Sequence, residues 1–518
     1  MTSITSIDHS ILTWILLLPA FGAVVAALLP ERGKLVQSWT LLIALATFAL
    51  TLHLPTHFDY NHPGFQFEIN RLWIVSPPIR YHLGIDGLSM WLVVLTGFLA
   101  PIGVLASWRA IDTRVKEFYS LFLLQQTAML GVFLALDLMV YYAFWELTLV
   151  PMAILIAMFG RDPGSRNSSR AAIKFFLYTF IPSALFLVGI LALYARTGTF
   201  DYLELKLQLM QNPSLFPPGA MWLISLSFLL AFAVKVPVFP LHGWLGDVFS
   251  EAPTAMAMVV AGKLGLYSLI RFHLGLFPFE SRRVAHWMIM LAVLGILYGA
   301  LVALVQNDLK RLLAFGTISS LSFCTLGIYT FAINGLDGAV FHILSESITG
   351  GALLVLFGVM YERYGTYEIE RYGGLAARTP RLATLFILTV LALIGLPILN
   401  GFVGEFLTLS SGFATSHVWG ALGTVGVILS AAYTLWMVQR VFYGPESPLV
   451  HRSPAHDLAA REHLALWPMA ALMVIMGVFS PYWIRAIDRG VHALSNAPAV
   501  SHPAAALASG PSHDEEAQ

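Results

Sequence analysis

Residues 224–271 read ISLSFLLAFAVKVPVFPLHGWLGDVFSEAPTAMAMVVAGKLGLYSLIR, and this part of the stretch Trp222–Arg271 decides how the chain folds. It carries Lys235 and Lys263 in two long apolar runs, joined by a turn rich in proline and acidic residues. A lysine at bilayer depth costs between ~2.5 kcal/mol on insertion scales and ~10 kcal/mol or more in simulations. Two such lysines predict a membrane protein that uses buried charge.

The composition assigns the whole chain to the membrane. Of its 518 residues 58% are apolar and 11% are charged, whereas about 25% are charged in a soluble domain. The 29 basic and 29 acidic residues balance, which gives no reason to expect nucleic acid as a partner. Cys324 is the single cysteine, so an intrachain disulfide, an iron–sulfur cluster and a thiolate zinc site are excluded.

Fourteen apolar runs are long enough to span a bilayer. They lie near residues 11–30, 35–54, 85–107, 116–136, 138–159, 171–195, 219–240, 252–273, 284–306, 312–332, 337–361, 381–406, 414–442 and 464–485. Tight joints, notably around Asp137, leave thirteen or fifteen open. The segment before the first run has no lysine or arginine, so we expect a retained helix rather than a signal peptide. Backbone groups must be paired in lipid and no barrel alternation is present, so we predict an all-α polytopic membrane protein.

The basic residues outside the runs predict the orientation. If the N-terminus is outside, eighteen basic residues lie in inside segments and nine in outside segments. By the positive-inside tendency we expect both termini on the outer, periplasmic side of a bacterial inner membrane. Residues 493–518 are rich in Ala, Pro, Ser and His and predict a disordered tail. No nucleotide loop, Rossmann fingerprint or Cys/His metal cluster occurs in the sequence, so we expect no cofactor in this chain.

Five charges of mixed sign lie well inside the predicted helices. They are Glu146, Lys235, Lys263, Glu346 and Glu405. Any one of them alone is explained equally well by a buried ion pair that serves only packing. Five together favour a proton relay, because each titratable group can change its charge at modest cost in a low dielectric.

Proline and glycine interrupt two of the helices that carry these charges. Pro237 and Pro240 follow Lys235 closely and should end its helix, while the Gly- and Pro-rich residues 395–404 precede Glu405. We expect Glu146 to face Lys235 and to gate its proton. Interruptions in two halves predict two inverted five-helix repeats with broken helices, residues 116–273 and 284–442, between N-terminal helices in 1–115 and a C-terminal helix in 464–490. The alternative is that Gly and Pro are simply common in membrane helices.

Histidine and amide side chains add polarity near the five charges. His242 lies seven residues after Lys235, where it either extends the relay or closes the Pro-rich turn. His342 and Glu346 are four residues apart and therefore share one helix face as a coupled pair. Gln125 and Gln126 add polarity to the fourth helix. For Asp86 and Asp137, at helix edges, a capping role is the ordinary explanation.

Seven segments together resemble the antiporter-like subunits of respiratory complex I, specifically the NuoM or subunit-4 family. They are LGIDGLSM (83–90), FWELTLVPM (144–152), KFFLYT (174–179), KVPVFPLHGWLGDVFSEAPT (235–254), NDLKRLLAF (307–315), YERYGT (361–366) and GLPILNGFVGEF (395–406). The resemblance covers about residues 80–445. Glutamate at position 405 favours subunit 4 over its two sister subunits.

The resemblance implies fourteen helices, two inverted half-channels and proton translocation driven by electron transfer elsewhere in the complex. Flavin, iron–sulfur clusters and quinone belong to other subunits, and two sister antiporter-like subunits are the implied partners in the bilayer. Glu146 and Lys235 match the input-side pair, Lys263 the connecting residue and Glu405 the output-side residue. The chain departs from the family at Ser320, where a histidine is usual, and at Glu346 with the serine that follows it, where His-Gly is usual.

The two departures lead to one hypothesis and leave two other functions open. We expect the pair His342/Glu346 to replace the missing histidines, because His342 lies one turn before Glu346. The first alternative function is a subunit of a multi-subunit sodium/proton antiporter or membrane-bound hydrogenase, which share these motifs. The second is a membrane-arm scaffold whose altered relay no longer pumps protons.

Overall fold

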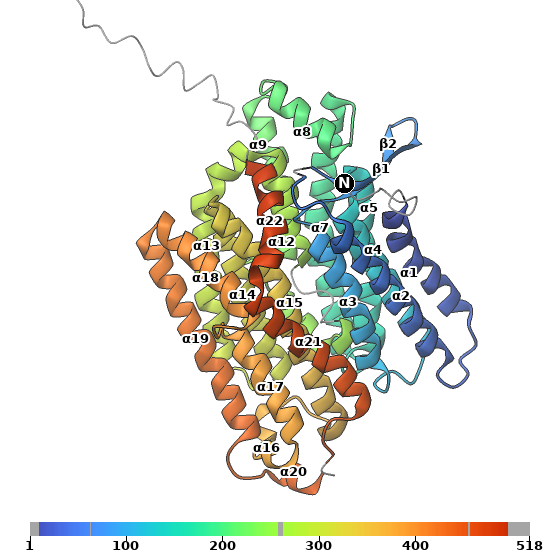
Figure 1. The fold of residues 1–518 in the computed structure, drawn as a ribbon, viewed down its shortest axis with the longest axis vertical. Coiled ribbons are helices and arrows are strands. Elements are labelled where there is room, and N and C mark those ends of the chain that lie inside the picture. The colour runs from blue at the N-terminus through green and yellow to red at the C-terminus, as the bar shows by residue number, and fades with distance from the viewer. Residues whose placement is uncertain (1–9, 63, 257–262, 454–455, 496–518) are drawn as a thin grey trace, which may run out of the picture.

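The structure, a computed structural model, describes residues 10–62, 64–256, 263–453 and 456–495. Helices make up nearly all of it, and this confirms the predicted all-α polytopic fold (Figure 1). Eleven described helices are long and apolar enough to cross a membrane, or up to twelve if one bent pair counts as a single span. The expected number of about fourteen therefore stays a prediction. Residues 496–518, nearly all of the expected disordered tail, lie outside the described ranges.

The first half of the chain contains nine helices among its described residues and one hairpin. In order they are α1 Ile11–Leu28, α2 Leu35–His57, β1 Gln66–Ile74, β2 Ile79–Ile85, α3 Met90–Ser107, α4 Val115–Leu134, α5 Leu138–Leu147, α6 Leu149–Phe159, α7 Arg166–Thr197, α8 Tyr202–Gln211 and α9 Pro218–Lys235. The hairpin and α8 lie at one end of the molecule, the top of Figure 1.

Helices joined by turns and loops make up the described residues of the second half. It comprises α10 Leu245–Glu251, α12 Lys263–Ser268, the π-helix η1 Leu269–Leu274, α13 Pro278–Leu304, α14 Leu309–Tyr329, α15 Ile333–Tyr364, η2 Ile369–Arg371, α16 Leu375–Arg378, α17 Pro380–Leu393, α18 Asn400–Thr415, α19 His417–Phe442, α20 Pro448–Arg452, α21 Ala460–Val478 and α22 Ser480–Ser495. Both α14 and α15 are largely buried and form the centre of this half. Of the five charges predicted to lie inside helices, Lys263 lies on α12, Glu346 on α15 and Glu405 on α18.

Two helices break close to a charged residue. As predicted, α9 ends at Lys235 just before Pro237, and the run around Glu405 divides into α17 and α18. Proline has no N–H to continue the helix, and Gly395 adopts φ +71, which suits glycine. A smaller irregularity was not predicted: α5 and α6 run on as one span, Leu138–Phe159, whose regular hydrogen bonding is interrupted only at Thr148, two residues after Glu146.

Two further elements differ from the sequence-based expectation. Residues 66–85 form the antiparallel hairpin β1–β2 rather than a plain loop, outside the predicted spans. The last apolar run does not continue as one helix, because α21 and α22 meet at an angle of 73°. Gly87 and Gly490 lie against each other's segments, so α22 packs on the turn that follows the hairpin.

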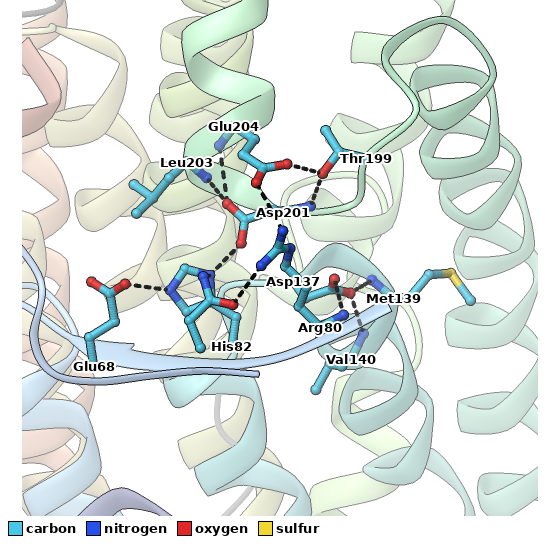
Figure 2. A network of polar contacts seen from close by, with 11 residues as sticks. Glu68, Arg80, His82, Asp137, Met139, Val140, Thr199, Asp201, Leu203 and Glu204 are labelled. Carbon is cyan, nitrogen blue, oxygen red and sulfur yellow. Dashed lines mark hydrogen bonds and ion pairs between the residues drawn. The ribbon is translucent and has the colours of Figure 1, made fainter. Parts of the chain in front are cut away.

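The hairpin is fastened to two helix N-termini by a network of polar contacts (Figure 2). Asp201 caps α8 by accepting from Leu203 and Glu204 N–H groups, and it also contacts Nδ1 of His82. On the other side of the His82 ring, Nε2 lies 3.1 Å from Glu68 Oε1, close enough for an ion pair although not aligned for a hydrogen bond. His82 is 1% exposed, so its charge is shared with these carboxylates rather than with water.

Asp137 completes this junction from the start of α5. Its carboxylate accepts from the N–H groups of Met139 and Val140, which confirms the predicted cap, and from the Arg80 N–H at 2.9 Å. The Arg80 side chain in turn reaches Glu204, 3.5 Å away. Three separate segments, the hairpin, the start of α5 and the start of α8, are therefore held at one point.

The imidazolium at the centre of the junction predicts a pH dependence. Burial opposes the charge, but the carboxylates of Asp201 and Glu68 outweigh it and raise the pKa of His82. A group with a raised folded-state pKa contributes its full stability below its ordinary value of about 6.5 and loses it as the pH rises through the folded-state value. The contribution of His82 is therefore largest under mildly acidic conditions.

We predict that His82→Gln lowers the free energy of local opening of the hairpin by about 3 kcal/mol at mildly acidic pH. The reason is that the variant leaves Asp201 buried without its ion partner. At high pH the native ring is neutral too, so the variant and the native chain should become similar. Tryptic cleavage at Arg71 in the hairpin of the assembled complex, normalised to a free peptide at each pH, measures the difference. An equal difference at both pH values would contradict the assignment.

Candidate functional site

Glu146 and Lys235, from α5 and the end of α9, lie near each other but do not form an ion pair. Lys235 is 7% exposed. Its Nζ donates to Thr148 Oγ1 at 2.9 Å and stands 4.7 Å from the centre of the Trp145 ring. Glu146 accepts instead from the Ser183 hydroxyl on α7. The carboxylate still acts electrostatically on Lys235, so the two charges are coupled without touching.

Lys263, the first residue of α12, is 2% exposed and opens the way toward the second half of the chain. A cavity of about 10 Å³ lies beside it, lined on its polar side by Thr96 and Gln126. Among the described residues, neither polar atom of the Gln126 amide has a hydrogen-bond partner. A water molecule needs about 10–15 Å³ and two or more polar partners, so this cavity fits one water between Gln126 and Lys263.

Between Lys235 and Lys263, the end of α9 contacts α12. The backbone of Gly265 lies so close to Val236 that a Cβ at this glycine would stand 2.7 Å from the Val236 nitrogen. Residues 257–262, which precede Lys263, lie outside the described ranges. On its other side, Lys263 interacts electrostatically with Glu346 on α15. Lys263 therefore lies between the segment that carries Lys235 and the helix that carries Glu346.

Ser320 joins His342 and Glu346 into one cluster at the centre of the molecule. Its Oγ lies 2.8 Å from His342 Nε2 and donates to Glu346 Oε2 at 3.0 Å. Thr317 donates to the other carboxylate oxygen at 3.2 Å. All of these side chains are at most 9% exposed. The sequence-based pair His342/Glu346 thus meets through a serine rather than directly.

The single hydrogen of the Ser320 hydroxyl fixes the direction of these bonds. When Ser320 donates to Glu346, its oxygen accepts from Nε2–H of His342. His342 Nδ1 is then the unprotonated nitrogen, and it has no hydrogen-bond partner among the described residues. The cluster forms a short hydrogen-bonded chain that leads from an imidazole to a carboxylate.

Two glycines bring Glu405 beside this cluster. A Cβ at Gly404 would lie 2.6–2.9 Å from the Cβ, Cα and N of His342, so α18 can approach α15 only with glycine there. A Cβ at Gly395 would lie 2.4 Å from Glu405 Oε2. Glu405 is 7% exposed and interacts electrostatically with Glu346. The break before α18 thus positions the last carboxylate of the row.

His242 is not joined to Lys235. Its ring stacks on Phe239 at a centroid distance of 5.5 Å and lies tilted against Tyr298 at 4.9 Å. Its carbonyl accepts from Leu245 N–H at the start of α10, and its Nδ1 has no partner within the described residues. This geometry favours the role in closing the Pro-rich turn over an extension of the relay.

Sequence reasoning missed two buried basic residues. Arg271, 2% exposed in η1, forms an ion pair with Asp86 and lies over the rings of Phe65 and Tyr267. Asp86, expected to be a simple cap, does accept from two backbone N–H groups but also partners this arginine. Lys310, also 2% exposed, donates to the Ala252 carbonyl at 2.6 Å. Both lie near helix ends, where hydropathy alone suggests exposure.

Hydroxyl partners were also missed, because a serine or threonine in a membrane helix usually bonds its own backbone. Ser183 and Thr148 contact the charges of the first half, and Thr317 and Ser320 those of the second. In the described part of the chain, no group of three His, Cys, Asp or Glu residues is arranged to hold a metal ion.

The fold and the row of coupled charges define a polytopic membrane protein of the antiporter-like class. Two family descriptions match: NADH:quinone oxidoreductase/Mrp antiporter over residues 135–430 and the amino terminus of NADH-ubiquinone oxidoreductase chain 4 over residues 14–137. The chain belongs to the family of subunit M, or chain 4, of NADH-quinone oxidoreductase.

Named relatives and solved structures agree with this assignment. Subunit M of Rhodobacter capsulatus is 38% identical over 91% of this chain and 93% of its own length, and that of Pseudomonas aeruginosa is 36% identical over 90% and 94%. A chain of respiratory complex I from Thermus thermophilus superposes with a TM-score of 0.84 at 31% identity, covering 94% of this chain and 99% of the other. A chain of the Mrp complex from Dietzia shares the fold, with a TM-score of 0.82 at 20% identity, covering 95% and 98%.

We predict that Gly404→Ala destabilises the chain by about 1–3 kcal/mol, because the added methyl group meets the backbone of His342, which cannot turn aside. The thermal stability of the detergent-solubilised complex measures the effect. Gly219→Ala in α9 is the matched control, since a Cβ there meets nothing within 4 Å. Equal stability of the two variants would contradict the close packing of α18 on α15.

Proposed function

We propose that this chain translocates protons along the row Glu146, Lys235, Lys263, Glu346 and Glu405, as a membrane-arm subunit of an NADH:quinone oxidoreductase. The family assignment supports the assembly and the overall function. In this proposal Glu146 and Lys235 form the input pair, Lys263 connects the two halves, and Glu405 is the output-side residue. Three neighbouring pairs of the row act on each other electrostatically. They are Glu146 with Lys235, Lys263 with Glu346, and Glu346 with Glu405.

The observation that carries the proposal is the hydrogen-bonded chain from His342 through Ser320 to Glu346. A proton moves along such a chain when one group donates while the next is already aligned to accept. The family usually has histidines at positions 320 and 346, and we propose that His342 and Glu346 supply this step here. The alternative, a scaffold that no longer pumps, predicts no need for an aligned hydroxyl between them.

The chain does no bond chemistry of its own in this proposal. Electron transfer through flavin, iron–sulfur clusters and quinone in other subunits drives the charge states of the row. Two sister antiporter-like subunits are the proposed membrane partners, and a bacterial inner membrane with both termini outside is the proposed location. The likeness to an Mrp complex chain supports a shared fold, and the identity to subunit M favours the oxidoreductase over an antiporter assembly.

The two inverted repeats, residues 116–273 and 284–442, remain part of the proposal. A break follows Lys235 in the first unit, and another precedes Glu405 in the second. Breaks of this kind free backbone groups at membrane depth and let a path enter from one side of the bilayer. We propose that each unit forms one half of the path, with the regions 1–115 and 464–490 packed outside both.

We predict that Lys235→Ala abolishes NADH-driven proton uptake by inverted membrane vesicles, and that Glu346→Gln reduces it at least tenfold, the effect expected when an essential relay group can no longer change its charge. NADH oxidation in the same vesicles shows whether electron transfer continues. If Glu346→Gln pumps normally while Lys235→Ala does not, the central step does not use the pair His342/Glu346. Normal pumping by both variants would favour the scaffold.

We further predict that Ser320→Ala slows proton uptake by roughly tenfold, because it removes the hydroxyl that joins His342 to Glu346 and one buried hydrogen bond to a charged group is worth about 1.5–3 kcal/mol. Ser320→Thr keeps a hydroxyl and should pump nearly as well as the native chain. Ser322→Ala on the same helix is the control, since that hydroxyl bonds only the Ile318 carbonyl. Equal rates for Ser320→Ala and Ser322→Ala would exclude the serine bridge.

A further inference from the structure

Glu146 and Lys235 each rest on a hydroxyl group of their own. Lys235 Nζ donates to Thr148 Oγ1 at 2.9 Å, and Glu146 accepts from Ser183 Oγ. Both hydroxyl-bearing residues are almost fully buried, at 2% and 1% exposure. In this arrangement the Thr148 hydroxyl offsets the desolvation of the buried Lys235, whereas Glu146, which accepts from Ser183, is only half-buried.

A backbone carbonyl of α5 sets the orientation of the Thr148 hydroxyl. Its hydroxyl donates to the Trp145 carbonyl at 2.7 Å, so its single hydrogen is already used and its oxygen faces Lys235 only as an acceptor. An ammonium and a neutral amine both carry N–H groups. Thr148 can therefore hold Lys235 in either protonation state, whereas contact with Glu146 favours the ammonium alone.

The Trp145 ring also helps to hold the Lys235 ammonium group in this position. The ring lies 4.7 Å from Nζ, and an indole face stabilises a cation without adding a negative charge. The residue is 2% exposed and therefore fixed in position. One residue thus supplies both the carbonyl that orients Thr148 and the ring under the lysine.

On the other side of the pair, Ser183 gives Glu146 a charge-assisted hydrogen bond. Tyr142, one turn earlier on α5, is the other titratable side chain in contact with this carboxylate. Among the described residues, Glu146 is the charged group that acts on Lys235, and α12, which begins at Lys263, packs against α9. The balance between separated and joined states therefore depends on these few contacts.

We propose that Thr148 and Ser183 are positioning residues that keep Glu146 and Lys235 apart between proton transfers. This inference rests on the proposed role of the pair in proton input. Without these hydroxyls we expect the two charges to close into an ion pair, because each then loses the side-chain hydrogen bond that it makes in the described structure. Lys235 then keeps its proton to a higher pH, and transfer onward slows.

The test compares Thr148→Val with Thr148→Ser in the complete complex. Valine has nearly the same shape as threonine but no acceptor, so we expect proton uptake by inverted vesicles to slow about tenfold, the factor for one hydrogen bond to a charged group, and its pH profile to shift toward alkaline pH. Serine keeps the acceptor and should restore both the rate and the profile. Ser183→Ala should shift the profile in the same direction.

Thr47→Val in α2 is the matched control, because this buried threonine also bonds its own helix, to the Ile43 carbonyl at 2.8 Å, and touches no charged group of the row. We expect it to pump like the native chain. If Thr148→Val and Ser183→Ala both keep the native rate and pH profile, the inference is wrong, while loss of pumping in Lys235→Ala still supports the proton path. Native pumping by Lys235→Ala would instead overturn the path itself.

Thr148→Val and Ser183→Ala combined provide a further check, with NADH oxidation in the same vesicles as the measure of assembly. If both hydroxyls stabilise the separated state of one equilibrium, their free-energy contributions add, so the double variant should slow pumping by at least the product of the single effects. A double variant no slower than the slower single variant would contradict a shared positioning role.

Discussion

A charge buried in a low-dielectric interior must have a partner that stabilises it, or it is lost. The five charged groups Glu146, Lys235, Lys263, Glu346 and Glu405 lie in described membrane helices, and their neighbours follow from that requirement. The partners are mostly neutral hydroxyls, as for Lys235 with Thr148 and Glu346 with Ser320. Neutral partners lower the cost of a charge without fixing it, so the groups can still gain and lose protons. Permanent ion pairs, such as Arg271 with Asp86, occur elsewhere, near helix ends.

Breaks in two helices make some of these arrangements possible. Lys235 is the last residue of α9, and Glu405 lies in the helix that starts after the break at Gly395. A continuous helix uses its own carbonyls and N–H groups, whereas a broken one leaves some of them to polar side chains and water. Lys235 and Glu405 therefore lie beside irregular backbone, whereas Glu346 lies within the continuous helix α15.

Hydropathy and spacing predicted the membrane fold, the breaks at Pro237 and Gly395, and the burial of Lys235, Lys263, Glu346 and Glu405. They failed where a feature depends on contacts between distant segments. The hairpin β1–β2 is short and lies between two spans. The irregularity at Thr148 is a single residue within one span, although Pro151, which has no N–H for the Leu147 carbonyl, follows three residues later. The bridging role of Ser320 needs the crossing of α14 and α15, which no local pattern contains. Arg271 and Lys310 were taken for surface residues because they stand near the ends of apolar runs.

Ser320 has one hydrogen to share between two neighbours, and this has a mechanical consequence. In the proposed path, a proton that passes from His342 through the hydroxyl to Glu346 would remain on the serine oxygen, which gives up its own hydrogen, so the O–H bond would end up pointing back toward His342. The hydroxyl must turn about its Cβ–Oγ bond before the next proton can follow. Each transfer would therefore consist of a proton hop followed by a rotation of the hydroxyl. Until that rotation, the hydroxyl hydrogen points toward His342 and no second proton can follow in the same direction.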